Sequence, residues 1–423
     1  MLRIGLVIDD GLDRPDGVQQ YVLTLGRRLT ALGHEVHYLA SQTERTDLDH
    51  LHVLGRHLGV RFNGNTLGTP LPASRIGVRT LLDELQLDVL HVQMPYSPFL
   101  AGRVVALAPA RTAVVGTFHI YPQSGLVRVG ARALGLVLRR QLRRFDSVVA
   151  VSQAAQEFAH EAFGLRTGVL ANPVELARFA PLDDDGRPGA AGSGEAGGGR
   201  PEPGRPVRIV FLGRLVDRKG PRELLAAAAE VARRGSTTAD WTLTIAGRGP
   251  LLDELRAAAE RDGLRDRVDL PGFVAEEDKA ALLADADIVA LPSTGGESFG
   301  ISVVEAMAAA RGIVLAGDNP GYRTTMLGLE DQLVDARDTA GFADVLARWV
   351  DDSAGRDRAA VRQRVAARQF DAGTITARVL DWYGAAVAGR GRAPGGGRPA
   401  GGAGDAGAGT PGVGTPGTEA GTD

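Results

Sequence analysis

Two glutamates, Glu297 and Glu305, lie eight positions apart in the stretch GGESFGISVVEAMA, residues 295–308. The two leading glycines permit unusual backbone dihedrals and close backbone approach, and the following residues then present unsatisfied N–H groups at the start of a helix. Glu297 could accept hydrogen bonds from the hydroxyls of a sugar there. Glu305 would lie two turns further along the helix, within range of a second ring such as a ribose. In isolation, the same pattern fits a first-turn acid favoured by the helix dipole and an exposed helical glutamate.

Three other junctions between an expected strand and its loop carry residues suited to binding. Gly17 opens a helix where backbone N–H groups can face an anion, although a plain turn glycine fits as well. His119 follows a buried strand, where its imidazole could bind a ligand or serve the fold alone. Arg214 and Lys219, in GRLVDRKG, suit a diphosphate, although surface basic pairs are common. Together with Glu297, these junctions favour a binding site over four unrelated features.

Alternating patterns place these junctions in parallel sheets. Short apolar runs that read as buried strands alternate with helical periodicity from RIGLVI to SVVAVS, and a second series of the same kind begins at VRIVFLG. Ligands in open α/β sheets bind outside the carboxyl ends of the strands. We therefore predict an α/β protein made of two doubly wound, Rossmann-like domains.

Two segments rich in glycine and proline separate or follow these series. Their composition cannot bury a core, so we expect a linker and a disordered tail. The acidic run Asp183 to Asp185 lies in the first of them, and we read it as solvated charge and not as a metal site. The expected division of the chain is 1–180, 181–206 (linker), 207–372, 373–389 (a final helix) and 390–423 (tail).

Composition excludes several classes of protein. The 423 residues exceed what one core usually organises, and 44% hydrophobic with 23% charged residues is ordinary for a soluble globular chain. The net charge of -3 gives no general attraction to nucleic acid. The absence of cysteine excludes disulfides and thiolate sites. Without a signal-like N-terminus or a spanning apolar run, we expect a cytoplasmic protein, with association at the inner face of the cell membrane left open.

The motifs resemble a known family. GGESFGISVVEAMA is similar to the E-x7-E signature of retaining glycosyltransferases of family 4, and GRLVDRKG, AGRGP and LPGFV follow in that family's order. RIGLVID, DGVQ, FNGN and TFH further resemble the phosphatidylinositol mannosyltransferases. The resemblance covers roughly residues 1–385 and implies the GT-B fold, in which two Rossmann-like domains face each other across a nucleotide-sugar cleft.

The resemblance also implies roles for individual residues. Arg214 and Lys219 would neutralise the leaving diphosphate, Glu297 would hold the donor sugar, and His119 would contact that sugar near the reacting carbon. Cations aimed at the leaving phosphate stabilise the transition state more than the ground state, so no metal or other cofactor is obligatory. The remaining donor contacts would come from Gly17 (diphosphate), Gly272, Phe273 and Val274 (base), Phe299, Gly300 and Ile301 (backbone N–H groups) and Glu305 (ribose).

Two departures from the family bear on the substrates. The family's double glycine before the first helix is here Asp16-Gly17, which places an acid near the diphosphate. The segment 74–85 offers only Arg75 and Arg79 where the mannosyltransferases carry a dense basic cluster. A replacement candidate is the helix within residues 127–144, which we expect to group four arginines on one side, with apolar residues on the other, although an ordinary packing helix fits too. The arginines are Arg139, Arg140, Arg143 and Arg144, and the apolar residues are Leu134, Val137, Leu138 and Phe145.

The sequence therefore predicts a retaining hexosyltransferase that favours mannose from GDP-mannose and a phosphatidylinositol-like lipid or polyol acceptor. A transferase using a UDP-sugar with another acceptor is the main alternative. A nucleotide-sugar epimerase and a catalytically silent paralogue are less well supported, because Glu297, Glu305, Arg214 and Lys219 are all present.

Overall fold

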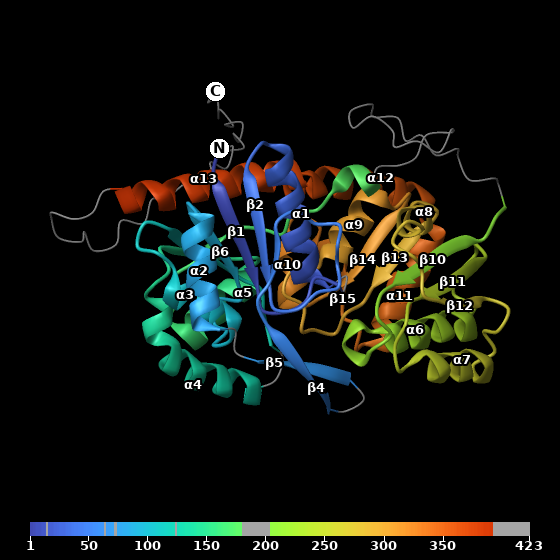
Figure 1. The fold of residues 1–423 in the computed structure, drawn as a ribbon. Coiled ribbons are helices and arrows are strands. Elements are labelled where there is room, and N and C mark those ends of the chain that lie inside the picture. The colour runs from blue at the N-terminus through green and yellow to red at the C-terminus, as the bar shows by residue number, and fades with distance from the viewer. Residues whose placement is uncertain (14–15, 63–64, 72–73, 123–124, 180–203, 392–423) are drawn as a thin grey trace, which may run out of the picture.

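Two parallel β-sheets, each flanked by helices, make up the protein in a computed structural model (Figure 1). The structure describes residues 1–13, 16–62, 65–71, 74–122, 125–179 and 204–391. The expected linker run Asp183 to Asp185, most of the expected tail, and Asn63 and Gly64 of FNGN lie outside the described residues. The predicted α/β fold class is confirmed.

The first sheet has the order β3-β2-β1-β6-β7-β8-β9 and is parallel throughout. Its order reverses between β1 and β6, because the chain winds outward from β1 in one direction and then returns to the other side. The strands are β1 Arg3–Ile8, β2 Glu35–Ala40, β3 Leu51–Val53, β6 Val89–Gln93, β7 Ala113–Phe118, β8 Ser147–Ala150 and β9 Gly168–Val169. The helices are α1 Gly17–Ala31, α2 Arg75–Leu85, α3 Leu100–Leu107, α4 Gly125–Leu142 and α5 Gln153–Phe163.

The second sheet has the order β12-β11-β10-β13-β14-β15 and reverses between β10 and β13. Its strands are β10 Val207–Leu212, β11 Trp241–Ala246, β12 Val268–Gly272, β13 Ile288–Leu291, β14 Ile313–Gly317 and β15 Leu333–Val334. Its helices are α6 Pro221–Arg234, α7 Leu252–Arg261, α8 Lys279–Ala284, α9 Ile301–Ala309, α10 Pro320–Thr325, α11 Thr339–Asp351 and α12 Ser353–Ala367.

An antiparallel hairpin was not predicted from the sequence. Strands β4 (Arg56–Phe62) and β5 (Asn65–Leu71) form a separate two-stranded sheet. Short 3-10 turns, which were also not predicted, are η1 Leu176–Phe179, η2 Asp217–Lys219, η3 Glu330–Gln332 and η4 Arg368–Phe370.

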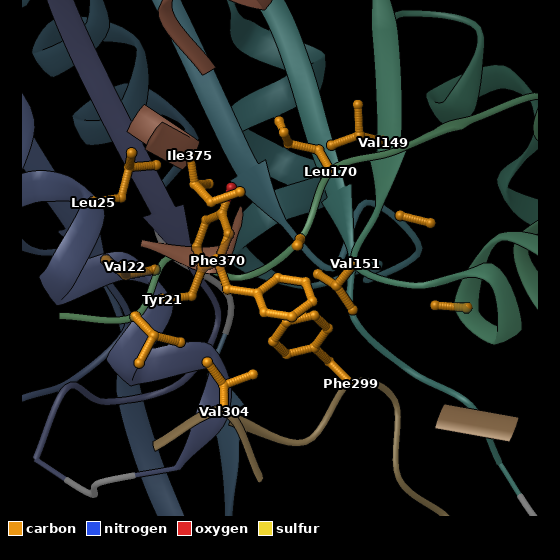
Figure 2. Packing of buried hydrophobic residues seen from close by; sticks show 14 of the residues in the cluster. Tyr21, Val22, Leu25, Val149, Val151, Leu170, Phe299, Val304, Phe370 and Ile375 are labelled. Carbon is orange, nitrogen blue, oxygen red and sulfur yellow. The ribbon is translucent and has the colours of Figure 1, made fainter. Parts of the chain in front are cut away.

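One hydrophobic cluster joins the two halves of the molecule. Tyr21 and Val151 of the first half pack near Phe299 of the second, and the Phe299 ring meets the Phe370 ring edge-on at 5.3 Å between centroids (Figure 2). The last helix, α13 (Ala372–Gly391), then returns along the first sheet (Figure 1). It extends two residues into what the sequence had predicted to be tail.

Candidate functional site

The candidate site lies where the carboxyl ends of the two sheets meet. Both sheets reverse their strand order next to their first strand, and ligands of open α/β sheets bind at such switch points. The N-terminus of α1 follows β1, and the N-terminus of α9 follows β13. These two termini meet, because a Cβ built on Gly17 would lie 3.6 Å from Ile301 Cδ1. The geometry places two helix N-termini at one point between the halves.

A strained loop positions Glu297 at this point. The φ angles of Gly295, Gly296 and Gly300 are 142°, 68° and 94°. Residues with a Cβ atom rarely adopt such positive values. A Cβ on Gly300 would in addition lie 2.5 Å from the Tyr322 ring. Glycine is therefore required where the loop turns into α9, and the loop directs the Glu297 side chain toward η2.

Glu297 is buried and held by cations. It is only 8% exposed, and its Oε1 lies 2.9 Å from Lys219 Nζ. Arg218 also pairs with it, and Ser293 Oγ donates to it at 3.2 Å. Burial alone would raise its pKa, but the charges of Lys219 and Arg218 outweigh that effect and leave the pKa below its ordinary value. Glu297 is therefore a carboxylate near neutral pH.

The two basic residues expected to act together are engaged differently. Lys219 is largely buried against Glu297, whereas Arg214 is well exposed and lies 4.0 Å from Asp16 Oδ1. Arg218, which sequence reasoning missed, supplies the second cation at Glu297. Its position directly before Lys219 is the only signal in the sequence that could have indicated it.

Glu305 lies on α9 facing the interface between the halves. It is buried, and Lys279 Nζ is 2.8 Å from its Oε2. Burial raises its pKa although Lys279 opposes the shift. Lys279, also missed from the sequence, lies 3.5 Å from Glu276 and 5.6 Å from the centre of the Phe179 ring. A lysine from α8 thus fixes the carboxylate that the family resemblance assigns to ribose.

A cleft of about 680 Å³ opens beside Glu305. It is bounded by α1, by the turn η1, by the segment before α8 and by α9. Residues that line it include Gln20, Leu23, Arg178, Glu276, Ile301 and Glu305. The cleft is therefore formed by both halves of the chain.

His119 lies at the end of β7, almost fully buried. Its Nε2 is 2.7 Å from Gln93 Oε1, and its ring meets the Tyr21 ring edge-on at 5.0 Å. Burial lowers its pKa to about 3, so the ring is neutral at physiological pH. Gln93 was not expected as a partner.

The residues expected to contact the base lie at and just after the end of β12. Gly272 ends β12 with φ of 83°, and its carbonyl accepts from Gly247 N at 2.6 Å. Phe273 is 56% exposed, and the Arg248 guanidinium lies 4.2 Å above its ring. Val274 is partly exposed. At the start of α9, the Phe299 side chain is buried in the core, so only its backbone can contact a ligand. Ile301 lines the cleft.

The basic face expected on α4 needs correction. Arg139, Arg140 and Arg143 are exposed, but Arg144 points inward and donates to the carbonyls of Pro109 and Thr112. Val137, expected on the packing side, is instead 78% exposed. Leu138 is buried, and Leu134 and Phe145 pack against the core as expected.

The exposed face of α4 is therefore largely apolar, is interrupted by Arg132, which pairs with Glu161, and is basic around the end of the helix. The large apolar residues exposed on it are Leu126, Val127, Val129, Leu136 and Val137. None of the helices that the structure describes has the length and apolar character needed to cross a membrane. Within the described residues, no group of three or more His, Cys, Asp or Glu side chains is arranged to hold a metal ion.

Comparison with known families gives two matches that together cover most of the chain. Residues 15–178 match the family described as "Glycosyltransferase Family 4", and residues 199–368 match "Glycosyl transferases group 1". The chain is 32% identical over 388 residues to a "Phosphatidyl-myo-inositol mannosyltransferase" of Mycolicibacterium smegmatis, covering 90% of this chain and 93% of that one. It is 30% identical over 402 residues to a "GDP-mannose-dependent alpha-(1-6)-phosphatidylinositol monomannoside mannosyltransferase" of Mycobacterium tuberculosis, covering 90% and 98%.

Solved structures share the fold. The Anabaena protein HepE in complex with UDP and glucose superposes with a TM-score of 0.68 at 19% identity, covering 91% of this chain and all of that one. Sucrose-phosphate synthase of Thermosynechococcus elongatus gives a TM-score of 0.66 at 20% identity, with 91% and 99% coverage. The two-sheet architecture is that of GT-B glycosyltransferases.

Proposed function

The chain belongs to glycosyltransferase family 4, and we propose that it transfers mannose from GDP-mannose to a phosphatidylinositol lipid with retention of configuration. One observation carries this choice within the family. Relatives named for mannosyl transfer to phosphatidylinositol or its monomannoside match about nine-tenths of the chain, so the similarity includes both halves of the candidate site.

The geometry supports a donor held between the two halves. Gly17 and the N-terminus of α1 would meet the diphosphate from one half, and Arg214 would meet it from the other. Glu297, kept ionised by Lys219 and Arg218, would accept hydrogen bonds from the sugar hydroxyls. The first N–H groups of α9, around Phe299, Gly300 and Ile301, would face the same sugar.

The reaction breaks the bond between the anomeric carbon and the diphosphate oxygen, and forms a bond from that carbon to an acceptor hydroxyl oxygen on the same face. The electron pair of the broken bond stays on the diphosphate, where Arg214 and Lys219 would stabilise the charge as it develops. The acceptor's proton leaves with the diphosphate, because neutral His119 is a poor acceptor with its low pKa. His119 would instead contact the sugar near the reacting carbon.

Glu305 and the loop 272–274 would hold the nucleoside. Lys279 fixes the Glu305 side chain at the wall of the cleft, where a carboxylate can accept from the two hydroxyls of a ribose. Gly272, Phe273 and Val274 would lie near the base, with Phe273 offering an exposed ring.

A lipid acceptor is supported by the exposed face of α4. Its apolar residues together with Arg139, Arg140 and Arg143 form an amphipathic surface of the kind that lies on anionic membranes. Membrane contact through this face would bring the protein to its lipid substrate.

Transfer assays with defined donors test the proposal. We expect the purified protein to transfer mannose from GDP-mannose to vesicles containing phosphatidylinositol, in the presence or absence of a chelator of divalent ions. UDP-glucose and UDP-N-acetylglucosamine, offered with the same vesicles, should give no product. Transfer from a UDP-sugar alone would overturn the donor assignment, and activity restored only by Mn²⁺ or Mg²⁺ would overturn the metal-independent mechanism.

A further inference from the structure

Asp16, the residue before α1, does not cap its own helix. Aspartate at this position usually accepts a hydrogen bond from an N–H group in the first turn. Here its side chain makes no such bond, although Gln20 N donates to its backbone carbonyl at 2.9 Å. Instead, Asp16 Oδ1 lies 4.0 Å from Nη1 of Arg214. The carboxylate is therefore paired across the site and not with its helix.

This pair lies where the donor's diphosphate is proposed to bind. The next residue, Gly17, approaches Ile301 at the start of α9, so both helix N-termini border the pair. The Asp16 side chain is 48% exposed and the Arg214 side chain 60% exposed. Exposed pairs of this kind are weak, so an incoming anion can replace Asp16 as the partner of Arg214.

The charges at this point are nearly balanced without a ligand. Arg214, Arg218 and Lys219 provide three cations, and Glu297 takes up the charge of one of them. Asp16 takes up that of another, so these described residues together leave a single uncompensated positive charge. A diphosphate therefore meets a site whose attraction Asp16 has already reduced.

We propose that Asp16 competes with the diphosphate for Arg214 and thereby hastens release of the nucleoside diphosphate product. This inference rests on the proposed function, since it places the diphosphate beside Arg214. In the donor, the terminal phosphate is esterified to the sugar. In the product it is free and ionises a second time at about pH 6, so the product carries more negative charge than the donor. Asp16 therefore repels the product more strongly than the substrate.

Titration calorimetry with GDP in the presence of a chelator tests the proposal. Asp16→Asn should bind GDP about fivefold to tenfold more tightly than the wild type at low salt, and the difference should shrink as salt is added. Asp16→Glu, which keeps the charge, should resemble the wild type. Asp83→Asn on α2 is the matched control for loss of an exposed acid, and it should leave GDP affinity unchanged.

A double-mutant cycle identifies the partner. In an Arg214→Gln background, the same Asp16→Asn change should alter GDP affinity less than twofold, because the cation for which Asp16 competes is gone. Equal GDP affinity of the wild type and Asp16→Asn would overturn the proposal. Weaker binding by Asp16→Asn, seen only when Mg²⁺ is present, would also overturn it and make Asp16 a metal ligand.

The same titration with UDP separates this inference from the proposed function. If the wild type binds UDP and not GDP, the donor assignment fails, and the Asp16 effect is read with UDP instead. If GDP binds but its affinity is the same in both proteins, only the role of Asp16 fails. A thermal melt of each variant shows whether it is folded.

Discussion

At the scale of the residue, the site depends on a carboxylate that is buried and yet charged. Glu297 meets two cations and a hydroxyl through one oxygen, Oε1. We propose that its other oxygen accepts hydrogen bonds from a ligand's hydroxyl groups. Hydrogen bonds to an ionised acceptor are stronger than those between neutral groups, and burial strengthens them further.

Replacing Glu297 tests this arrangement. Glu297→Ala should remove a charge-assisted hydrogen bond of about 1.5–3 kcal/mol, and kcat/KM for transfer should fall about tenfold to a hundredfold. The measurement is steady-state transfer from GDP-mannose. Glu277→Gln removes an exposed acid from the loop before α8 and serves as the control with wild-type rates. Unchanged turnover of Glu297→Ala with full donor binding would show that Glu297 does not hold the sugar.

Buried histidines should make the protein's stability depend on pH, and His91 and His119 are the two with the largest shifts. Burial lowers the pKa of both His91 and His119 to about 3, whereas an unfolded histidine titrates near 6.5. Between these values the unfolded chain binds more protons, so the free energy of unfolding decreases as pH falls below about 6.5. Each histidine contributes up to about 1.4 kcal/mol per pH unit.

Urea unfolding at pH 7.5, 6 and 5 measures this dependence. His91→Gln should show a shallower loss of stability toward low pH, because one of the strongly shifted groups is gone. The exposed His160 on α5 provides the matched variant, and His160→Gln should keep the wild-type slope. A slope identical in wild type and His91→Gln would contradict the assignment of His91 as a neutral buried ring.

Sequence reasoning identified the acids of the site but not the groups that hold them. The glycines and glutamates of GGESFGISVVEAMA form a local pattern, so the start of α9 could be predicted. Lys279 meets Glu305 from a different helix, and Asp16 meets Arg214 from the other half of the chain. Such pairs depend on how the elements pack in three dimensions, and this packing cannot be read from the sequence.

At the scale of the element, buried strands were predicted better than helix faces. A run such as RIGLVI is apolar on both sides because helices cover both faces of a parallel sheet, and it is the strand β1. The side of α4 that faces solvent was less evident, because its exposed face is itself largely apolar. Arg144 was assigned to the wrong side for the same reason.

Vesicle sedimentation tests whether α4 docks on membranes. Replacing Arg139, Arg140 and Arg143 with glutamine should weaken binding to vesicles that contain anionic lipid, since each arginine near such a surface contributes about 1 kcal/mol. The loss should be large at low salt and smaller as salt screens the wild type. In a control variant, the exposed residues Arg256, Arg261 and Arg265 are replaced with glutamine, so the same number of positive charges is lost. Equal sedimentation of the two variants would count against docking through α4.

At the scale of the whole molecule, the two halves share a hydrophobic core, and helix α13 connects them. The cluster around Phe299 and Phe370 contains residues of both halves (Figure 2). Helix α13 then packs against the first sheet. Its Tyr383 hydroxyl lies 2.6 Å from His91 Nδ1, and Trp382 Nε1 donates to Ser147 Oγ at 2.9 Å.

Removing one hydroxyl should therefore destabilise both halves together. Tyr383→Phe leaves the buried His91 Nδ1 without its partner and should lower the free energy of unfolding by about 1–3 kcal/mol. Chemical denaturation followed by far-UV circular dichroism should still show a single transition. Tyr121→Phe, in a partly exposed position, is the control with little loss. Two separate transitions, with only one of them shifted by Tyr383→Phe, would contradict a shared core.

The cations around Glu297 also determine which inhibitors suit the enzyme. Iminosugars imitate a sugar by placing a protonated nitrogen in the ring, and they bind well where an unpaired carboxylate faces that charge. Here Lys219 and Arg218 already surround Glu297, and the helix N-termini add partial positive charge. A cationic sugar mimic would meet repulsion at this point. Sugar mimics with an uncharged ring and an attached phosphate or other acidic group are the better starting compounds.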